Sequence, residues 1–182
     1  MYKLGHLVNG EWVQYHHPAL FSLPDEESHQ RISAGVPGSD PEVFLRLARC
    51  LEEPLLLLHI LHTTRGEAEP ARFQSPELSF QEIEAFISAF RPFLANDSRF
   101  DLWVHSPSQQ ATLAWDRHDM LYAYGPLDDY EGALRELGFS EGEPQVPVPH
   151  AHNYHAELDA MSREVIEWCD WWASPLRPED EQ

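Results

Sequence analysis

Apolar and polar residues follow two different periods along this chain of 182 residues. A spacing of three or four residues, typical of an amphipathic helix, recurs in four segments. Short apolar runs bounded by Gly, Pro, Asn or Asp lie between these segments and predict strands. The pattern indicates an α+β fold in which about four helices pack against a mostly antiparallel sheet.

The first predicted element is a hairpin. Residues 4–8 and 11–14 flank Asn9 and Gly10, a pair that tolerates the positive φ angles of a type I′ turn. Residues 15–38 follow without a clean period, and His, Pro and Gly are frequent among them. We therefore expect an ordered but irregular loop after the hairpin.

A helix and a buried strand are predicted next. Asp40 can cap the free amides of a helix, and Pro41 stands where its missing N–H costs nothing. Pro54 ends this helix, and the short apolar run 55–61 follows. Such a run predicts a strand covered on both faces, and we place it at the centre of the sheet.

The best local signal is the capping box of Ser79 and Glu82, which predicts a helix beginning at Ser79. Apolar residues recur at helical spacing until Asn96 and Asp97 break the pattern. Three short runs typical of strands follow, joined by Ser-Pro and Arg-His-Asp turns. We expect an antiparallel meander over residues 100–105, 111–116 and 120–124.

Two more helices complete the pattern. One starts after Gly125 and Pro126 and ends at Gly138. Trp171 lies beside the apolar stripe of the last helix, which makes it a candidate for a surface contact. The stripe itself consists of Leu158, Met161, Val165, Trp168 and Trp172.

The length fits one domain, so we expect residues 1–182 to form a single α+β unit with a disordered acidic tail, 177–182. Cys50 and Cys169 lie far apart without metal-ligand spacing, which indicates buried free thiols in a reducing compartment. No signal peptide or membrane-spanning run is evident in the sequence. These features predict a cytoplasmic protein.

Charge changes this picture most. The chain has 31 Asp and Glu residues against 12 Lys and Arg residues, a formal net charge of −19. The acidic residues are spread along the chain, so they decorate a folded surface. Such a field repels nucleic acid and anionic membranes and favours a basic protein partner. The alternative is a structural or regulatory subunit whose acidic residues serve only its solubility.

Motifs for common chemistry are absent from the sequence, which has no GxGxxG, GxxxxGK[ST], HExxH or GxSxG. Lys3 is its only lysine, so a reaction that needs a catalytic lysine has no plausible candidate. Trp115 to Asp119 include a carboxylate, an imidazole and a guanidinium, but this segment is more typical of a polar hairpin turn. We expect no cofactor and assign no catalytic residue.

One cluster has residue types that could bind a metal. His150 and His152 form an HxH pair, His155 follows three residues later, and Glu157 adds a carboxylate. Imidazole and carboxylate groups within one turn can converge on a metal ion. The alternative function is therefore a metal-dependent enzyme that uses these four residues. In the other interpretation, the histidines supply hydrogen bonds where a loop enters a helix.

The stretch WDRHDMLYAYG (115–125), followed by PLDDY (126–130) and a short helix, resembles a strand-to-helix pattern of small acidic bacterial immunity proteins of polymorphic-toxin systems. The resemblance implies a cytoplasmic protein that neutralises a cognate basic toxin domain by occlusion and needs no chemistry of its own. The acidic composition favours the same class of function.

The candidates for contact with such a partner are carboxylates and aromatic residues at predicted helix ends and loops. The first group lies at a helix start beside the meander: Asp128, Asp129, Tyr130 and Glu131. The second group lies in a predicted loop between a strand and a helix: Glu67 and Glu69. Trp171 is the candidate aromatic anchor. The identity of the partner, the stoichiometry and the oligomeric state stay open.

Overall fold

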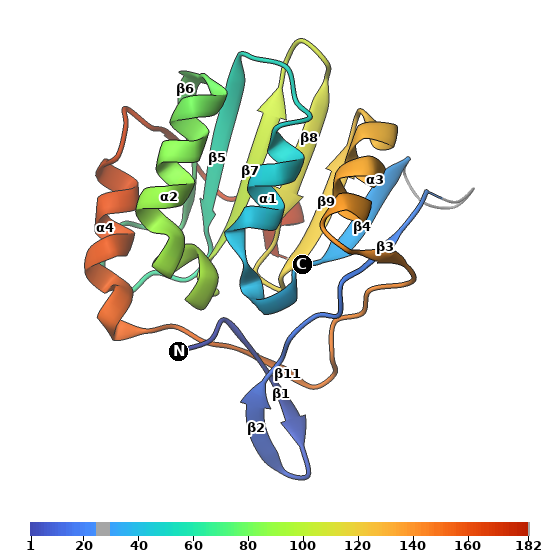
Figure 1. The fold of residues 1–182 in the computed structure, drawn as a ribbon. Coiled ribbons are helices and arrows are strands. Elements are labelled where there is room, and N and C mark those ends of the chain that lie inside the picture. Colours follow the sequence, from blue (N-terminus) through green and yellow to red (C-terminus); the bar gives the residue numbers. More distant parts are fainter. Residues whose placement is uncertain (25–29, 182) are drawn as a thin grey trace.

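Two β-sheets and four α-helices make up the protein in a computed structural model that describes residues 1–24 and 30–181 (Figure 1). The larger sheet has nine strands and the smaller sheet has three. The predicted single-domain α+β class with mostly antiparallel sheet is confirmed. Part of the predicted acidic surface, residues 25–27, lies outside the described residues.

All neighbouring strands of the larger sheet are antiparallel except β10 and β3, which are parallel. Strands β7, β8 and β9 are neighbours, as the predicted meander requires. The run 55–61 is a strand, β5, but β8 holds the middle position, so our central placement of β5 was wrong. The spatial order is β10 (Ser140–Glu141), β3 (Leu20–Ser22), β4 (Arg31–Gly35), β9 (Met120–Tyr124), β8 (Ala111–Trp115), β7 (Phe100–Ser106), β5 (Leu55–Leu61), β6 (Ala71–Leu78) and β12 (Trp172–Ser174).

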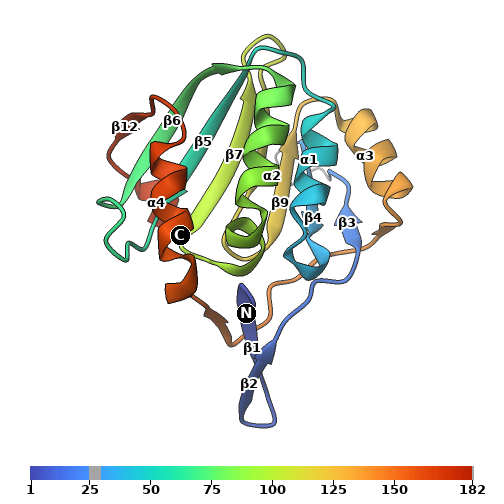
Figure 2. The ribbon, with the colours of Figure 1, turned by 60° about the vertical axis from the view of Figure 1, so that its left-hand side comes forward.

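The four helices cover one face of this sheet (Figures 1 and 2). They are α1 (Pro41–Ala48), α2 (Phe80–Asn96), α3 (Leu127–Glu136) and α4 (Asp159–Glu167). The predicted capping box of α2 is confirmed, because the Ser79 N–H donates to Glu82 Oε2 at 2.8 Å and the Glu82 N–H donates back to Ser79 Oγ. Asp40 caps α1 in the predicted way, accepting from the Glu42 N–H at 3.0 Å.

The core lies between the helices and the sheet. Phe100, Leu102 and Val104 of β7 are fully buried, while the residues that alternate with them are half-buried. Because side chains of a strand alternate between its two sides, the sheet has a core face and an open face. Its open face carries Trp103 and the tyrosines of β9, and none of the four α-helices of the described residues covers it.

The C-terminal residues cross the open face. The 3₁₀ turn η3 (Pro178–Glu181) places the buried Asp180 against Arg72 of β6, and the Arg177 N–H donates to Asp180 Oδ2 at 2.7 Å. In Figure 1 this red segment is seen behind the strands, on the side away from the helices. Residues 178–181 belong to the acidic tail that we predicted to be disordered, while Gln182 lies outside the described residues.

Several strands lie where we predicted loops, among them β3, β4 and β6. The irregular segment 15–38 contains β3 and β4, and the predicted loop before α2 contains β6. Only Ile32 and Ala34 give β4 an alternating apolar pattern, and Pro76 interrupts that of β6. These strands form by pairing with other strands: β3 with β4, β4 with the sequence-distant β9, and β6 with β5, the strand just before it in the chain.

The last helix is shorter than predicted, because α4 ends at Glu167. Trp172 belongs to the edge strand β12 and is 72% exposed, so it does not continue the apolar stripe of the helix. Trp171 instead packs against Phe86 of α2, and its indole N–H donates to the Val165 carbonyl at 2.9 Å. Trp171 and Trp172 thus have the reverse of their predicted environments, while Trp168 packs against the core as predicted.

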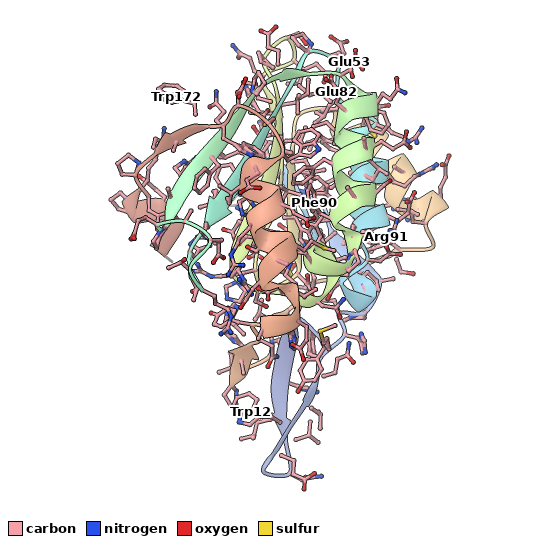
Figure 3. All side chains as sticks on the ribbon, turned by 90° about the vertical axis from the view of Figure 1, so that its left-hand side faces the viewer. Trp12, Glu53, Glu82, Phe90, Arg91 and Trp172 are labelled. Atoms are coloured by element: carbon pink, nitrogen blue, oxygen red, sulfur yellow. The ribbon has the colours of Figure 1, made fainter. Side chains whose placement is uncertain are left out.

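The smaller sheet consists of β11 (His150–His152), β1 (Leu4–Val8) and β2 (Glu11–Gln14), and it lies below the large sheet in Figure 1. The predicted hairpin is confirmed, with φ angles of 53° at Asn9 and 87° at Gly10. Trp12 on this hairpin and Trp172 on β12 lie far apart at the periphery (Figure 3). Within residues 1–24 and 30–181, no helix has both the length and the apolar composition needed to cross a bilayer.

Candidate functional site

The helical layer carries more carboxylates than cationic side chains. Helices α1 to α4 together contain ten Asp or Glu residues and four Arg residues. Within the described residues, eight of the twelve Lys and Arg side chains form ion pairs with carboxylates of the protein itself. These pairs take up five of the ten helical carboxylates: Glu42, Glu84, Glu131, Glu136 and Asp159. The other five helical carboxylates have no ion-pair partner among the described residues.

The predicted contact group on α3 divides into exposed and buried members. Asp128 and Asp129 are exposed in the first turn, and neither forms an ion pair with another described residue. Glu131 is bound to Arg135 at 2.7 Å. Tyr130 is fully buried, which raises the pKa of its hydroxyl, so its assignment as a contact residue is corrected.

The second predicted group divides in the same way. Glu69 is exposed, whereas the carboxylate of Glu67 is buried and binds Arg99 at 3.1 Å and the Ser162 hydroxyl at 3.0 Å. Glu67 therefore stabilises the interior and is withdrawn as a contact residue. Trp171 is withdrawn too, because its ring packs against the core and its N–H is already bonded.

Arg99 is the centre of a buried charge network. Its guanidinium donates to both oxygens of Asp97 at 2.8 Å, and it also binds Glu67 and Asp159. Burial works against the charged guanidinium, but the hydrogen bonds and negative charge of Asp97 outweigh it and raise the pKa of Arg99. The network fixes the start of α4 against the loop that follows β5.

A second cluster, of histidines, lies where β11 meets the turn between β8 and β9. His150 and His152 are two residues apart in β11, so their side chains lie on the same side of the strand. The ring of His118 in the turn packs against both, with centroid separations of 5.0 and 4.7 Å. One nitrogen from each of the three rings lies within 4.8 Å of the other two.

Two carboxylates hold the turn that carries His118. Asp116 Oδ1 accepts from two backbone N–H groups of the turn, at 2.8 and 2.9 Å. The buried Asp119 binds Lys3 Nζ at 3.0 Å and accepts from the Trp115 indole N–H at 3.1 Å. The polar turn predicted for Trp115 to Asp119 is confirmed, and Lys3 anchors the N-terminal strand to it.

The histidine cluster contains a neutral imidazole. Burial lowers the pKa of His152 to about 3, and the positive charge of Arg117 acts in the same direction. Its ring is therefore uncharged near neutral pH and keeps a nitrogen lone pair. A neutral imidazole is the form that can bind a metal ion.

Only two of the four ligands that the sequence suggested belong to this cluster. His155 Nε2 lies 3.0 Å from the Tyr2 carbonyl oxygen, and its backbone N–H donates to Asp97. Glu157 is exposed on the 3₁₀ turn η2 (Ala156–Leu158). The third member, His118, was missed as a ligand because it comes from a turn 32 residues before His150. No local spacing could have linked them.

The two cysteines are free and half-buried, so the expectation of free thiols holds although their burial is incomplete. Burial raises the pKa of both, that of Cys169 to about 11. Both thiols therefore stay protonated near neutral pH, and neither is an activated nucleophile.

No family model matches this chain, and comparisons with curated proteins and with solved structures found no match either. What the residues do must be inferred from their chemistry and their placement.

Proposed function

We propose that this protein is a non-enzymatic binding protein that captures a basic protein partner on its helical face. The observation that carries the proposal is the excess of carboxylates on the one face that all four helices cover. Asp128 and Asp129 are the leading contact residues, because both are exposed and neither has an ion-pair partner among the described residues.

The partner class we propose is a cognate toxin domain, neutralised by occlusion in the cytoplasm. The likeness of residues 115–130 to small acidic immunity proteins supports this class, as does the net charge of −19. Occlusion needs a rigid surface of complementary charge and no catalytic group. A fold with a buried ionic network under α4 is suited to that task.

Electrostatics predicts how the complex should behave. A face with excess negative charge accelerates encounter with a cationic protein at low ionic strength. At about 0.15 M salt the screening length is about 8 Å, so this acceleration should fade as salt is added. An association rate that falls steeply with salt is therefore the expected signature.

The test uses a basic protein captured at 1:1 stoichiometry from the native source, with its association rate measured at low and high salt. Reversal of both carboxylates, Asp128→Lys with Asp129→Lys, should slow association about tenfold at low salt and flatten the salt dependence. The matched control, Glu77→Lys with Glu143→Lys, changes the net charge equally at exposed positions outside the helices. Equal slowing in both variants would show that net charge alone acts, and unchanged rates in the first would remove α3 from the interface.

A further inference from the structure

The cluster of His118, His150 and His152 has the donor set of a metal site. We propose that these three imidazoles bind one divalent transition-metal ion, zinc by preference, at the junction of the two sheets. Three imidazoles without a thiolate or carboxylate favour borderline ions such as zinc over magnesium or calcium, which prefer oxygen ligands. The site does not depend on the proposed partner or on the helical face.

Hydrogen bonds orient two of the rings for this role. Asp116 Oδ2 lies 3.1 Å from His118 Nδ1, and the Pro147 carbonyl oxygen lies 3.0 Å from His150 Nδ1. Both partners are acceptors, so in each ring Nδ1 carries the proton and donates it. The Nε2 atoms of His118 and His150 are thereby left with free lone pairs, as in metal sites whose ligating histidines donate their other nitrogen to a carboxylate or a carbonyl.

His152 adds a ring with an unsatisfied nitrogen to the cluster. Its Nδ1 is buried and has no hydrogen-bond partner among the described residues. A buried polar atom without a hydrogen-bond partner has lost its bonds to water and has gained none in the protein, so it destabilises the fold. Metal coordination would therefore involve His152, an imidazole whose hydrogen-bonding capacity is not fully used within the protein.

The distances require a small adjustment. Tetrahedral zinc, with Zn–N bonds of about 2.0–2.1 Å, places its nitrogen ligands about 3.4 Å apart. One nitrogen from each ring lies within 4.8 Å of a nitrogen of each of the other two. The backbone on both sides is already fixed in place, so modest rotations of the imidazole side chains are enough to close that gap. On one side the turn is held by Asp116 and Asp119, and on the other β11 pairs with β1.

Three protein ligands leave a fourth tetrahedral position for water or for another ligand, which distinguishes such a site from a closed structural site with four. The ion would also tie β11 to the turn between β8 and β9, and so join the smaller sheet to the larger one. The net charge of −19 favours the accumulation of cations near the protein.

The first experiment measures binding of zinc to metal-stripped protein by competition with a chromophoric chelator. We expect one equivalent per chain, and dissociation constants raised about 100-fold or more by His118→Ala, His150→Ala or His152→Ala. Two matched controls, His16→Ala and Glu157→Gln, change exposed residues outside the cluster and should leave the constant unchanged. Absence of stoichiometric binding, or an unchanged constant in His118→Ala, would overturn the proposal.

The second experiment separates coordination from folding. Asp116→Asn keeps the oxygen that holds the turn but loses the anionic acceptor for His118 Nδ1. We expect zinc binding about tenfold weaker with an unchanged urea midpoint of the metal-free protein. Cobalt in place of zinc should give the intense visible absorption of a tetrahedral site, and His118→Ala should remove it. A spectrum like that of aqueous cobalt in the unmodified protein would contradict the proposed geometry.

Discussion

The buried His59 should lower the free energy of unfolding in acid, and the structure allows us to quantify this loss. It lies in β5, fully buried, and its ring is surrounded by Phe73, Phe93 and Phe100 at centroid distances of 5.2–6.4 Å. Neither ring nitrogen has a hydrogen-bond partner among the described residues. The surroundings therefore suit an apolar ring better than an imidazole, and we choose His59→Phe as the perturbation.

The magnitude follows from the pKa of this group. Burial lowers the pKa of His59 to about 3, with smaller and partly opposing effects from Glu67, His62 and Arg99. The unfolded chain has the ordinary value of about 6.5, so it binds a proton between these two values while the folded protein does not. Stability is therefore lost as the pH falls from about 6.5 toward 3. Between pH values of about 7.5 and 5 this loss is about 2 kcal/mol.

The assay is urea unfolding of the wild type and of His59→Phe at both pH values. Near pH 7.5 the variant should be more stable by about 1–2 kcal/mol, because two unpaired buried nitrogens are removed and the slightly larger ring costs some packing strain. Near pH 5 the difference should grow by about 2 kcal/mol, since the variant has no imidazole to protonate at this position. Other titrating groups are common to both proteins and cancel.

A difference between variant and wild type that is the same at both pH values would refute this account of His59. The matched control is His16→Gln, which removes an exposed imidazole. Its stability relative to the wild type should not change with pH. A change in this control as large as that of His59→Phe would point to the unfolded chain as the source of the effect.

Two further predictions concern local contacts. Ser79→Ala should lower the free energy of unfolding by about 1 kcal/mol, because it removes the hydroxyl that caps α2; no loss in urea unfolding would mean that the N–H of Glu82 finds another acceptor. Arg99→Met should cost about 3–5 kcal/mol, because Asp97 would stay buried without its cation. A smaller loss, below about 1 kcal/mol, would show that the network is dispensable for stability.

The predictable parts of the fold are those specified by neighbours in sequence. The capping box before α2 and the Asn9-Gly10 turn act over three or four residues, and both are present. By contrast, β4 carries a weak pattern of its own and depends on pairing with the distant β9, while the pattern of β6 is interrupted by Pro76 although its partner β5 is the preceding strand. Trp172 shows the same limit, since an edge strand that pairs with β6 replaced the predicted continuation of a helix.

Only the part of the candidate metal site that is specified by neighbours in sequence was predicted. His150 and His152 are two residues apart, so an extended strand is enough to align them. His118 joins them only because β11 pairs with β1 and because Lys3, in the segment leading to β1, is bound to the turn between β8 and β9. His155, close in sequence, is directed to the Tyr2 carbonyl oxygen instead.

Lys3 has a consequence for chemical modification of the protein. It is the only lysine of the sequence, and its side chain is inaccessible to solvent, bound to Asp119 and stacked 4.1 Å above the ring of Trp115. An acylating reagent can reach this amine only when the N-terminal strand detaches, so the acylation rate at Lys3 would report the frequency of that opening. Once acylated, the side chain would have lost the charge that Asp119 requires, and the strand could not return to its place.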